Sequence, residues 1–145
     1  VGYPGETEAD HDALLRFVEA AQLDWCGFFR FSDEEGTYAH TLDGHVDPDL
    51  MDDRLAELRE LQDGITASRR DCLIGREVTV LVDAPGEGRT FREAPEIDGI
   101  VTVPDTLEPA RFHTVRVIDA QGPDLVAEPV LEPSAAGPSP RGADS

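Results

Sequence analysis

The sequence predicts a two-part molecule, an α/β segment followed by an all-β segment. Up to residue 67, apolar residues recur at helical spacing on both sides of one dense apolar run. Beyond Arg69 the apolar period falls to two, and short β-rich runs alternate with Pro, Gly and Asp turns. We therefore expect one domain at 1–67 and another at 68–131. The Pro/Ser/Ala/Gly-rich tail at 132–145 is expected to be disordered.

The first segment opens on a residue that resembles the end of a strand. Val1 precedes a Gly/Pro turn, and no initiator methionine is present, so we expect a fragment of a longer chain. Thr7 is a suitable N-cap for a helix over 8–22. The apolar stripe of this helix consists of Leu14, Phe17, Val18 and Ala21, widened by Leu15.

The run that follows, residues 23–31 (LDWCGFFRF), is almost continuously apolar. This composition predicts a parallel strand buried on both faces, with its aromatic residues in the core. Asp47-Pro48 then predicts the start of a second helix, which should end near Ser68. Strand end, helix and buried strand together indicate a parallel sheet or barrel.

The second segment contains four β-rich runs, at 77–83, 97–103, 112–118 and 124–130. Turn sequences such as Ala-Pro-Gly and Gln-Gly-Pro separate them. Several short strands in about 60 residues predict a small antiparallel barrel of OB-like proportions.

The charge balance is the most informative feature of the composition. The chain has 31 acidic and 12 basic residues, a net charge of −19, and every basic residue is arginine. Such a surface repels phosphate backbones and attracts a basic partner. A solubilising acidic surface without any partner explains the same composition equally well.

Other compositional signals point to a cytoplasmic protein. The sequence contains no apolar run of the roughly 20 residues that a membrane-spanning helix needs. Cys26 and Cys72 lie far apart, and we expect both to be reduced thiols. The four histidines show no metal-ligand spacing.

Three stretches of the chain resemble parts of one enzyme family, the radical S-adenosylmethionine methylthiotransferases. Val1–Thr7 (VGYPGET) resembles the turn after the fifth strand of the family's catalytic barrel. Phe29–Ser32 (FRFS), with Glu35–Thr37 and Ala39, is similar to the sixth strand and its exit loop. Leu73–Val82 (LIGREVTVLV) resembles the first strand of a TRAM domain, the small β-barrel appended to these enzymes.

A further stretch indicates the branch of the family. Gly88–Gly99 (GRTFREAPEIDG) resembles the signature of the RimO branch, and Asp124–Glu128 (DLVAE) matches its closing strand. That branch methylthiolates an aspartate of small-subunit ribosomal protein twelve. Ala127 replaces a usual glycine and Ala110-Arg111 a common Gly-Asp, which affects local turns more than identity.

The resemblance implies a fold and a set of cofactors. Residues 1–67 would be the last β/α units of a TIM-like radical S-adenosylmethionine barrel, and residues 68–131 the TRAM domain. The parent enzyme would use S-adenosylmethionine and two [4Fe–4S] clusters. This chain lacks the CxxxCxxC motif, because its two cysteines are 46 positions apart. We therefore expect it to catalyse nothing alone.

Two groups of residues are candidate sites under this resemblance. Pro4 and Gly5, with Phe31 and Ser32, would line the cofactor cavity, because ligands bind beyond the C-terminal ends of barrel strands. In the alternative, the same residues serve only to connect strand and helix.

The second group is Glu93, Glu96 and Asp98, which would present an acidic face to the basic ribosomal protein. In the alternative, Pro95 and Gly99 shape a turn whose charges simply face water.

Two other functions remain open. The sister enzyme modifies adenosine in transfer RNA, and its TRAM domain should be basic to hold RNA. Residues 68–131 carry 12 acidic and 7 basic residues, a net charge of −5, so we expect no nucleic-acid binding. A non-catalytic TRAM binding module is the other alternative, and half a barrel at 1–67 argues against it.

Overall fold

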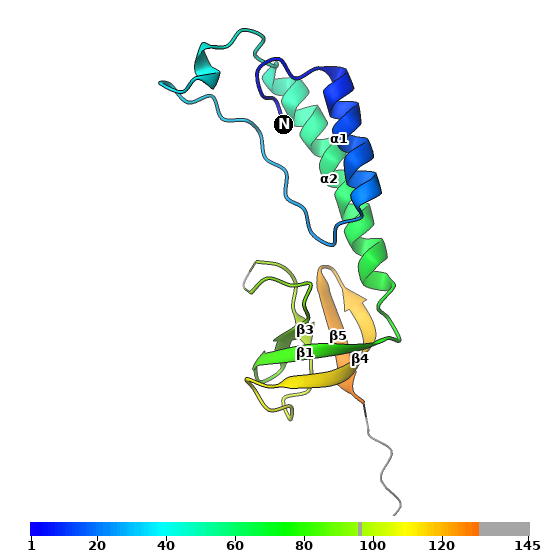
Figure 1. The fold of residues 1–145 in the computed structure, drawn as a ribbon. Helices are drawn as coiled ribbons and strands as arrows, with labels where there is room; N and C mark the ends of the chain where they lie inside the picture. Colours follow the sequence, from blue (N-terminus) through cyan, green and yellow to red (C-terminus); the bar gives the residue numbers. More distant parts are fainter. Residues whose placement is uncertain (96, 131–145) are drawn as a thin grey trace, which may run out of the picture.

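The computed structural model describes residues 1–95 and 97–130. Two helices lie side by side, and a small β-barrel lies beyond the C-terminal end of the second helix (Figure 1). The predicted tail at 132–145 lies outside the described residues. Neither helix in the described part is both long and apolar enough to cross a bilayer.

Helix α1 (Glu8–Ala21) begins and ends close to the predicted positions. Thr7 and Asp10 form a reciprocal capping box, in which the Asp10 amide donates to Thr7 Oγ1 at 3.3 Å and the Thr7 amide to Asp10 Oδ2 at 2.9 Å. The hydrogen bonds from Thr7 lower the pKa of the Asp10 carboxyl. Gln22 ends the helix in the left-handed conformation, with φ 48°.

Helix α2 (Pro48–Asp71) starts as predicted, with Asp47 as N-cap and proline at the first position. It continues three residues beyond the predicted end at Ser68. Arg69 and Arg70 occupy its last turn, where cations interact favourably with the helix dipole. The helix therefore passes the expected boundary at 67 and leads almost directly into the barrel (Figure 1).

The two helices run in the same direction. Glu6 and Glu8 contact Arg54, and His11 contacts Glu57. Residues later in the first segment therefore contact residues later in α2, as parallel helices require. Their shared core consists of Val18, Leu58 and Ile65, with Leu14, Leu15, Phe28 and Leu61 packed against it. Parallel neighbouring helices joined by a returning segment are the arrangement of consecutive β/α units.

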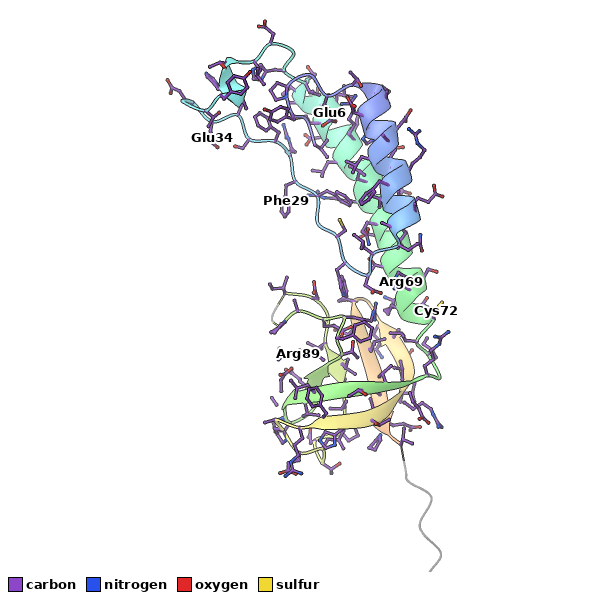
Figure 2. All side chains as sticks on the ribbon, in the orientation of Figure 1. Glu6, Phe29, Glu34, Arg69, Cys72 and Arg89 are labelled. Atoms are coloured by element: carbon purple, nitrogen blue, oxygen red, sulfur yellow. The ribbon has the colours of Figure 1, made fainter. Side chains whose placement is uncertain are left out.

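The returning segment differs from the prediction. Residues 23–31 are extended but form no strand, as Figure 2 shows for the segment that carries Phe29. The Phe29 side chain is 79% exposed. One parallel bridge is present: the Val1 amino group donates to Phe29 O at 2.9 Å, and Phe31 N donates to Val1 O at 2.7 Å. The prediction of a buried strand was therefore wrong for this chain. A strand buried in the middle of a sheet needs hydrogen-bonded neighbours on both edges, and among the described residues only Val1 forms backbone hydrogen bonds with this segment.

The barrel contains five strands in the closed order β1-β2-β3-β5-β4. Their bounds are β1 Glu77–Ala84, β2 Glu87–Arg89, β3 Val101–Thr102, β4 Phe112–Gln121 and β5 Asp124–Pro129. The short β2 was not predicted, and β3 is shorter than the β-rich run predicted at 97–103. A short helical turn, η1 (Ala39–Thr41), precedes α2.

The expected all-antiparallel pairing was wrong at one position, because β3 pairs parallel with β5. The odd number of strands requires one parallel pair. Directions that alternate around a closed ring need an even number of strands, and this ring has five. The barrel core is built from inward-facing residues of β1, β3, β4 and β5 and from Val103, which follows β3: Val80, Val82, Val101, Val103, Val115, Val117, Leu125 and Ala127.

Candidate functional site

The structure brings the two halves of the predicted cofactor site together. The Val1–Phe31 bridge places the Tyr3–Gly5 turn beside the end of the extended segment. The rings of Tyr3 and Phe31 meet edge to face, with centroids 5.3 Å apart. Pro4 is buried, Phe31 is half-buried, and Gly5 and Ser32 are exposed. The turn and the end of the extended segment thus lie next to each other at the N-terminal end of both helices.

Two residues of α2 fix the shape of that turn. Buried Arg54 donates to Glu6 Oε1 at 2.8 Å and to Glu8 Oε2 at 3.0 Å, and these carboxylates raise the pKa of its guanidinium. Glu6 in turn accepts the Gly2 amide at 2.6 Å. Gly2 has φ 89°, and a Cβ there would overlap the Met51 side chain, so glycine is required.

The predicted acidic face is arranged differently from the expectation. Glu93 is 7% exposed, and its Oε2 accepts the Thr90 amide at 2.8 Å and the Thr90 hydroxyl at 2.6 Å. Its carboxylate therefore holds the loop together and is turned away from any partner. Its burial could not be predicted, because a glutamate that is buried against local donors leaves no periodic signal in the sequence.

The other two residues of that face have separate outcomes. Asp98 is half-buried, and its Oδ2 accepts the Ala94 amide at 2.8 Å. Glu96 lies outside the described residues.

An ionic cluster that sequence analysis missed joins the two parts of the chain. Asp24, just after α1, accepts from Arg69 Nε of α2 at 2.8 Å and from Arg92 Nε of the barrel loop at 3.0 Å. The hydrogen bonds from Arg69, then from Arg92, lower the pKa of the Asp24 carboxyl. Gln62 and Thr66 donate to the carbonyls of Leu23 and Asp24, at 2.9 and 2.8 Å. Of these residues, only Arg92 could have been singled out from the sequence, because it lies in the signature stretch Gly88–Gly99.

The described residues do not fit an iron–sulfur cluster. Cys26 and Cys72 are free thiols on separate elements, and no three His, Cys, Asp or Glu side chains at 1–95 and 97–130 converge as ligands. The chemistry of such a cluster is therefore not assigned to residues of this chain.

The chain is similar to known proteins along most of its length. Residues 74–130 match the TRAM domain family. "Ribosomal protein uS12 methylthiotransferase RimO" of Koribacter versatilis is 43% identical over 139 residues, 88% of this chain and 28% of its own. The proteins of the same name from Azoarcus sp. and Moorella thermoacetica are 45% and 46% identical, over 90% and 76% of this chain.

The match covers only part of each relative. The chain spans 31% of the Azoarcus protein and 26% of the Moorella protein. The TRAM match coincides with the five-stranded barrel, which begins at Glu77 and closes at Pro129. The chain therefore belongs to the RimO family of ribosomal protein uS12 methylthiotransferases and corresponds to the C-terminal region of its members, including the TRAM domain.

Proposed function

We propose that this chain is the C-terminal portion of an enzyme that methylthiolates an aspartate of ribosomal protein uS12 by radical S-adenosylmethionine chemistry. The observation that carries the proposal is the identity of 41% or more to proteins of that name over 76–90% of the chain. S-adenosylmethionine and two [4Fe–4S] clusters would supply the radical and the sulfur. The parent enzyme would provide the cluster ligands, and the chain alone is expected to be inactive.

Residues 1–67 are, in this proposal, the last β/α units of the catalytic barrel. The parallel helices and the Val1–Phe31 bridge support it, because two parallel helices joined through one parallel backbone bridge are the arrangement of adjacent β/α units. Pro4, Gly5, Phe31 and Ser32 would then form one wall of the cofactor cavity. Arg54 would keep that wall in place by holding Glu6 and Glu8.

Residues 68–131 are proposed to recognise the protein substrate. The pairing of its arginines with carboxylates supports a protein substrate and disfavours an RNA substrate. Of the seven arginines in this range, six already form ion pairs with carboxylates: Arg69, Arg70, Arg89, Arg92, Arg111 and Arg116. RNA binding relies on cations that are free to neutralise phosphates. A basic protein would instead meet the excess of carboxylates, including Asp98 and Glu96.

Two alternatives stay open under the same fold. A transfer RNA methylthiotransferase would share the catalytic β/α barrel and the TRAM domain, but the pairing of the TRAM arginines with carboxylates disfavours it. A non-catalytic TRAM module would not need the helical part, whose turn is held by a buried arginine on two carboxylates.

Surface plasmon resonance with this chain immobilised tests the proposal. We expect uS12 to bind, to bind more weakly at physiological than at low salt, and to outcompete transfer RNA. Asp98→Asn keeps the acceptor for Ala94 and removes the charge, and Glu96→Gln removes the neighbouring one. Together they should slow association more than they speed dissociation. Glu19→Gln, an exposed carboxylate on α1, is the matched control and should change little.

If the chain bound transfer RNA more tightly than uS12, the assignment to the branch that modifies uS12 would be wrong. Binding that does not respond to salt would remove the electrostatic part of the proposal.

A further inference from the structure

An apolar groove of about 430 Å³ lies on the outside of the barrel. It runs over the outer face of β1, whose Leu81 pairs with Phe112 of β4 on one side and Arg89 of β2 on the other. Leu73 and Val78 also line it. Phe91 and Phe112 flank the groove and are 95% and 73% exposed.

Two exposed phenylalanines beside one concave surface are unusual for a monomer in water. Contiguous apolar patches of this kind mark interaction sites more often than isolated exposed residues do. Folding does not require Phe91, because its side chain is almost fully solvated and lies outside both core clusters. Its exposure therefore points to a contact made with another molecule.

The charges around the groove indicate the chemistry of that molecule. Arg92 is bound by Asp24 at 3.0 Å, Arg89 lies 3.4 Å from Asp83, and Glu77 pairs with Arg116 at 2.9 Å. The groove thus presents aromatic rings without an unpaired arginine. Proteins that stack nucleic-acid bases on aromatic rings combine them with free cations along the backbone. A chain of net charge −19 instead favours a positively charged ligand.

We propose that this groove is the anchor site for the basic protein substrate, taking one apolar side chain of that protein between Phe91 and Phe112. The proposal rests on the proposed function, since uS12 is the partner it assumes. The acidic surface draws the basic protein in, and the groove holds it by burying apolar area. The two contributions are separable, because charge governs association and buried anchors govern dissociation.

The test measures uS12 binding to this chain with Phe91→Ala, with Phe112→Ala and with both. We expect dissociation to be about tenfold faster for each single variant, as for aromatic anchors of interfaces, and association to be unchanged. Ile118→Ala is the control, because Ile118 is 48% exposed on β4 but does not line the groove. Hydrogen exchange of β4 and β5 checks the barrel. Phe91→Ala stays informative if Phe112→Ala unfolds it.

Each outcome is decisive. If wild-type chain binds uS12 and Phe91→Ala dissociates at the wild-type rate, the groove is not the anchor and the proposed function stands. If wild-type chain does not bind uS12, the proposed partner is wrong and the anchor site falls with it. Transfer RNA binding that Phe91→Ala abolishes would show that the aromatic rings stack bases, and would overturn the proposal.

Discussion

At the scale of single residues, Asp24 connects α2 with the TRAM loop. Its carboxylate accepts hydrogen bonds from Arg69 of α2 and Arg92 of the TRAM loop, and its carbonyl oxygen accepts one from the Thr66 hydroxyl. The Arg92 side chain is only 5% exposed, so removal of the Asp24 carboxylate would leave this buried cation with only its longer, 3.5 Å contact to Glu93 Oε1. The same loop carries Glu93 and Phe91, and Asp24 therefore fixes how the TRAM loop sits against the helices.

We predict that Asp24→Asn lowers the free energy of unfolding by about 2 kcal/mol at neutral pH, as expected for charge-assisted hydrogen bonds to a buried arginine. Urea denaturation measures it, with Asp52→Asn as control, because the Arg30–Asp52 pair is exposed and should contribute about 0.5 kcal/mol or less. An equal effect of both substitutions would contradict the role given to Asp24.

The pH dependence of that difference follows from the lowered pKa of Asp24. A carboxyl whose pKa is lower in the folded state stabilises the fold above its ordinary pKa of about 4, and this stabilisation is lost as pH falls through the lowered value. The difference in stability between wild type and Asp24→Asn should therefore begin to shrink near pH 4 and should vanish once the pH is below the lowered pKa of Asp24. A difference that persists at lower pH would show that the hydrogen bonds, without the charge, account for the effect.

At the scale of elements, two glycines show how local geometry sets sequence requirements. A Cβ on Gly88 in β2 would lie 2.5 Å from Val80 Cγ1 and 2.7 Å from the Leu81 carbonyl oxygen. The short strand β2 can approach β1 only because this Cβ is missing. Gly64 lies within α2, and a Cβ there would meet nothing within 4 Å.

We predict opposite effects for the two alanine substitutions. Gly88→Ala should destabilise the barrel by about 2 kcal/mol through overpacking against backbone. Gly64→Ala should stabilise the helical part by about 0.5 kcal/mol, because alanine restricts the unfolded chain. Thermal unfolding followed by circular dichroism checks both. Stabilisation by Gly88→Ala would mean that β2 can move away from β1 at little cost.

The helices and most strands could be predicted because their signals are local. Thr7 and Asp10 form the capping box with each other, and Asp47-Pro48 begins α2 without help from the rest of the fold. The short β2 and the parallel β3–β5 pair could not be predicted in this way, because barrel closure determines them.

The candidate sites divide in the same manner. Adjacency of the Tyr3–Gly5 turn to Phe31 follows from β/α order, whereas burial of Glu93 and the Asp24–Arg92 contact depend on packing between distant segments.

At the scale of the whole molecule, the two parts differ in how well they bury their own apolar surface. The barrel closes on itself and has no free edge, whereas the segment at 23–31 has one bridge and leaves Phe29 exposed. The longest ladders, β1–β4 and β4–β5, hold the barrel together. We therefore expect the chain to unfold unevenly.

Hydrogen exchange should show this directly. Amides of β4 and β5 should be protected to the level of global unfolding of the barrel, and amides of 1–67 should exchange faster, fastest along 23–47. Equal protection in both parts would mean that the ionic cluster at Asp24 makes the chain one cooperative unit. Repetition with Asp24→Asn would then separate the barrel from the helices.

The measurement that tests the central claim most directly is the activity of a chimaera. This chain would replace the matching region of the Koribacter versatilis relative, to which it is 43% identical, and the product would be incubated with uS12 and with transfer RNA. We predict that mass spectrometry finds one methylthio group on an aspartate of uS12 and none on transfer RNA. The relative without its matching region should modify neither. A chimaera that folds and modifies transfer RNA, or that leaves uS12 unmodified, would contradict the account.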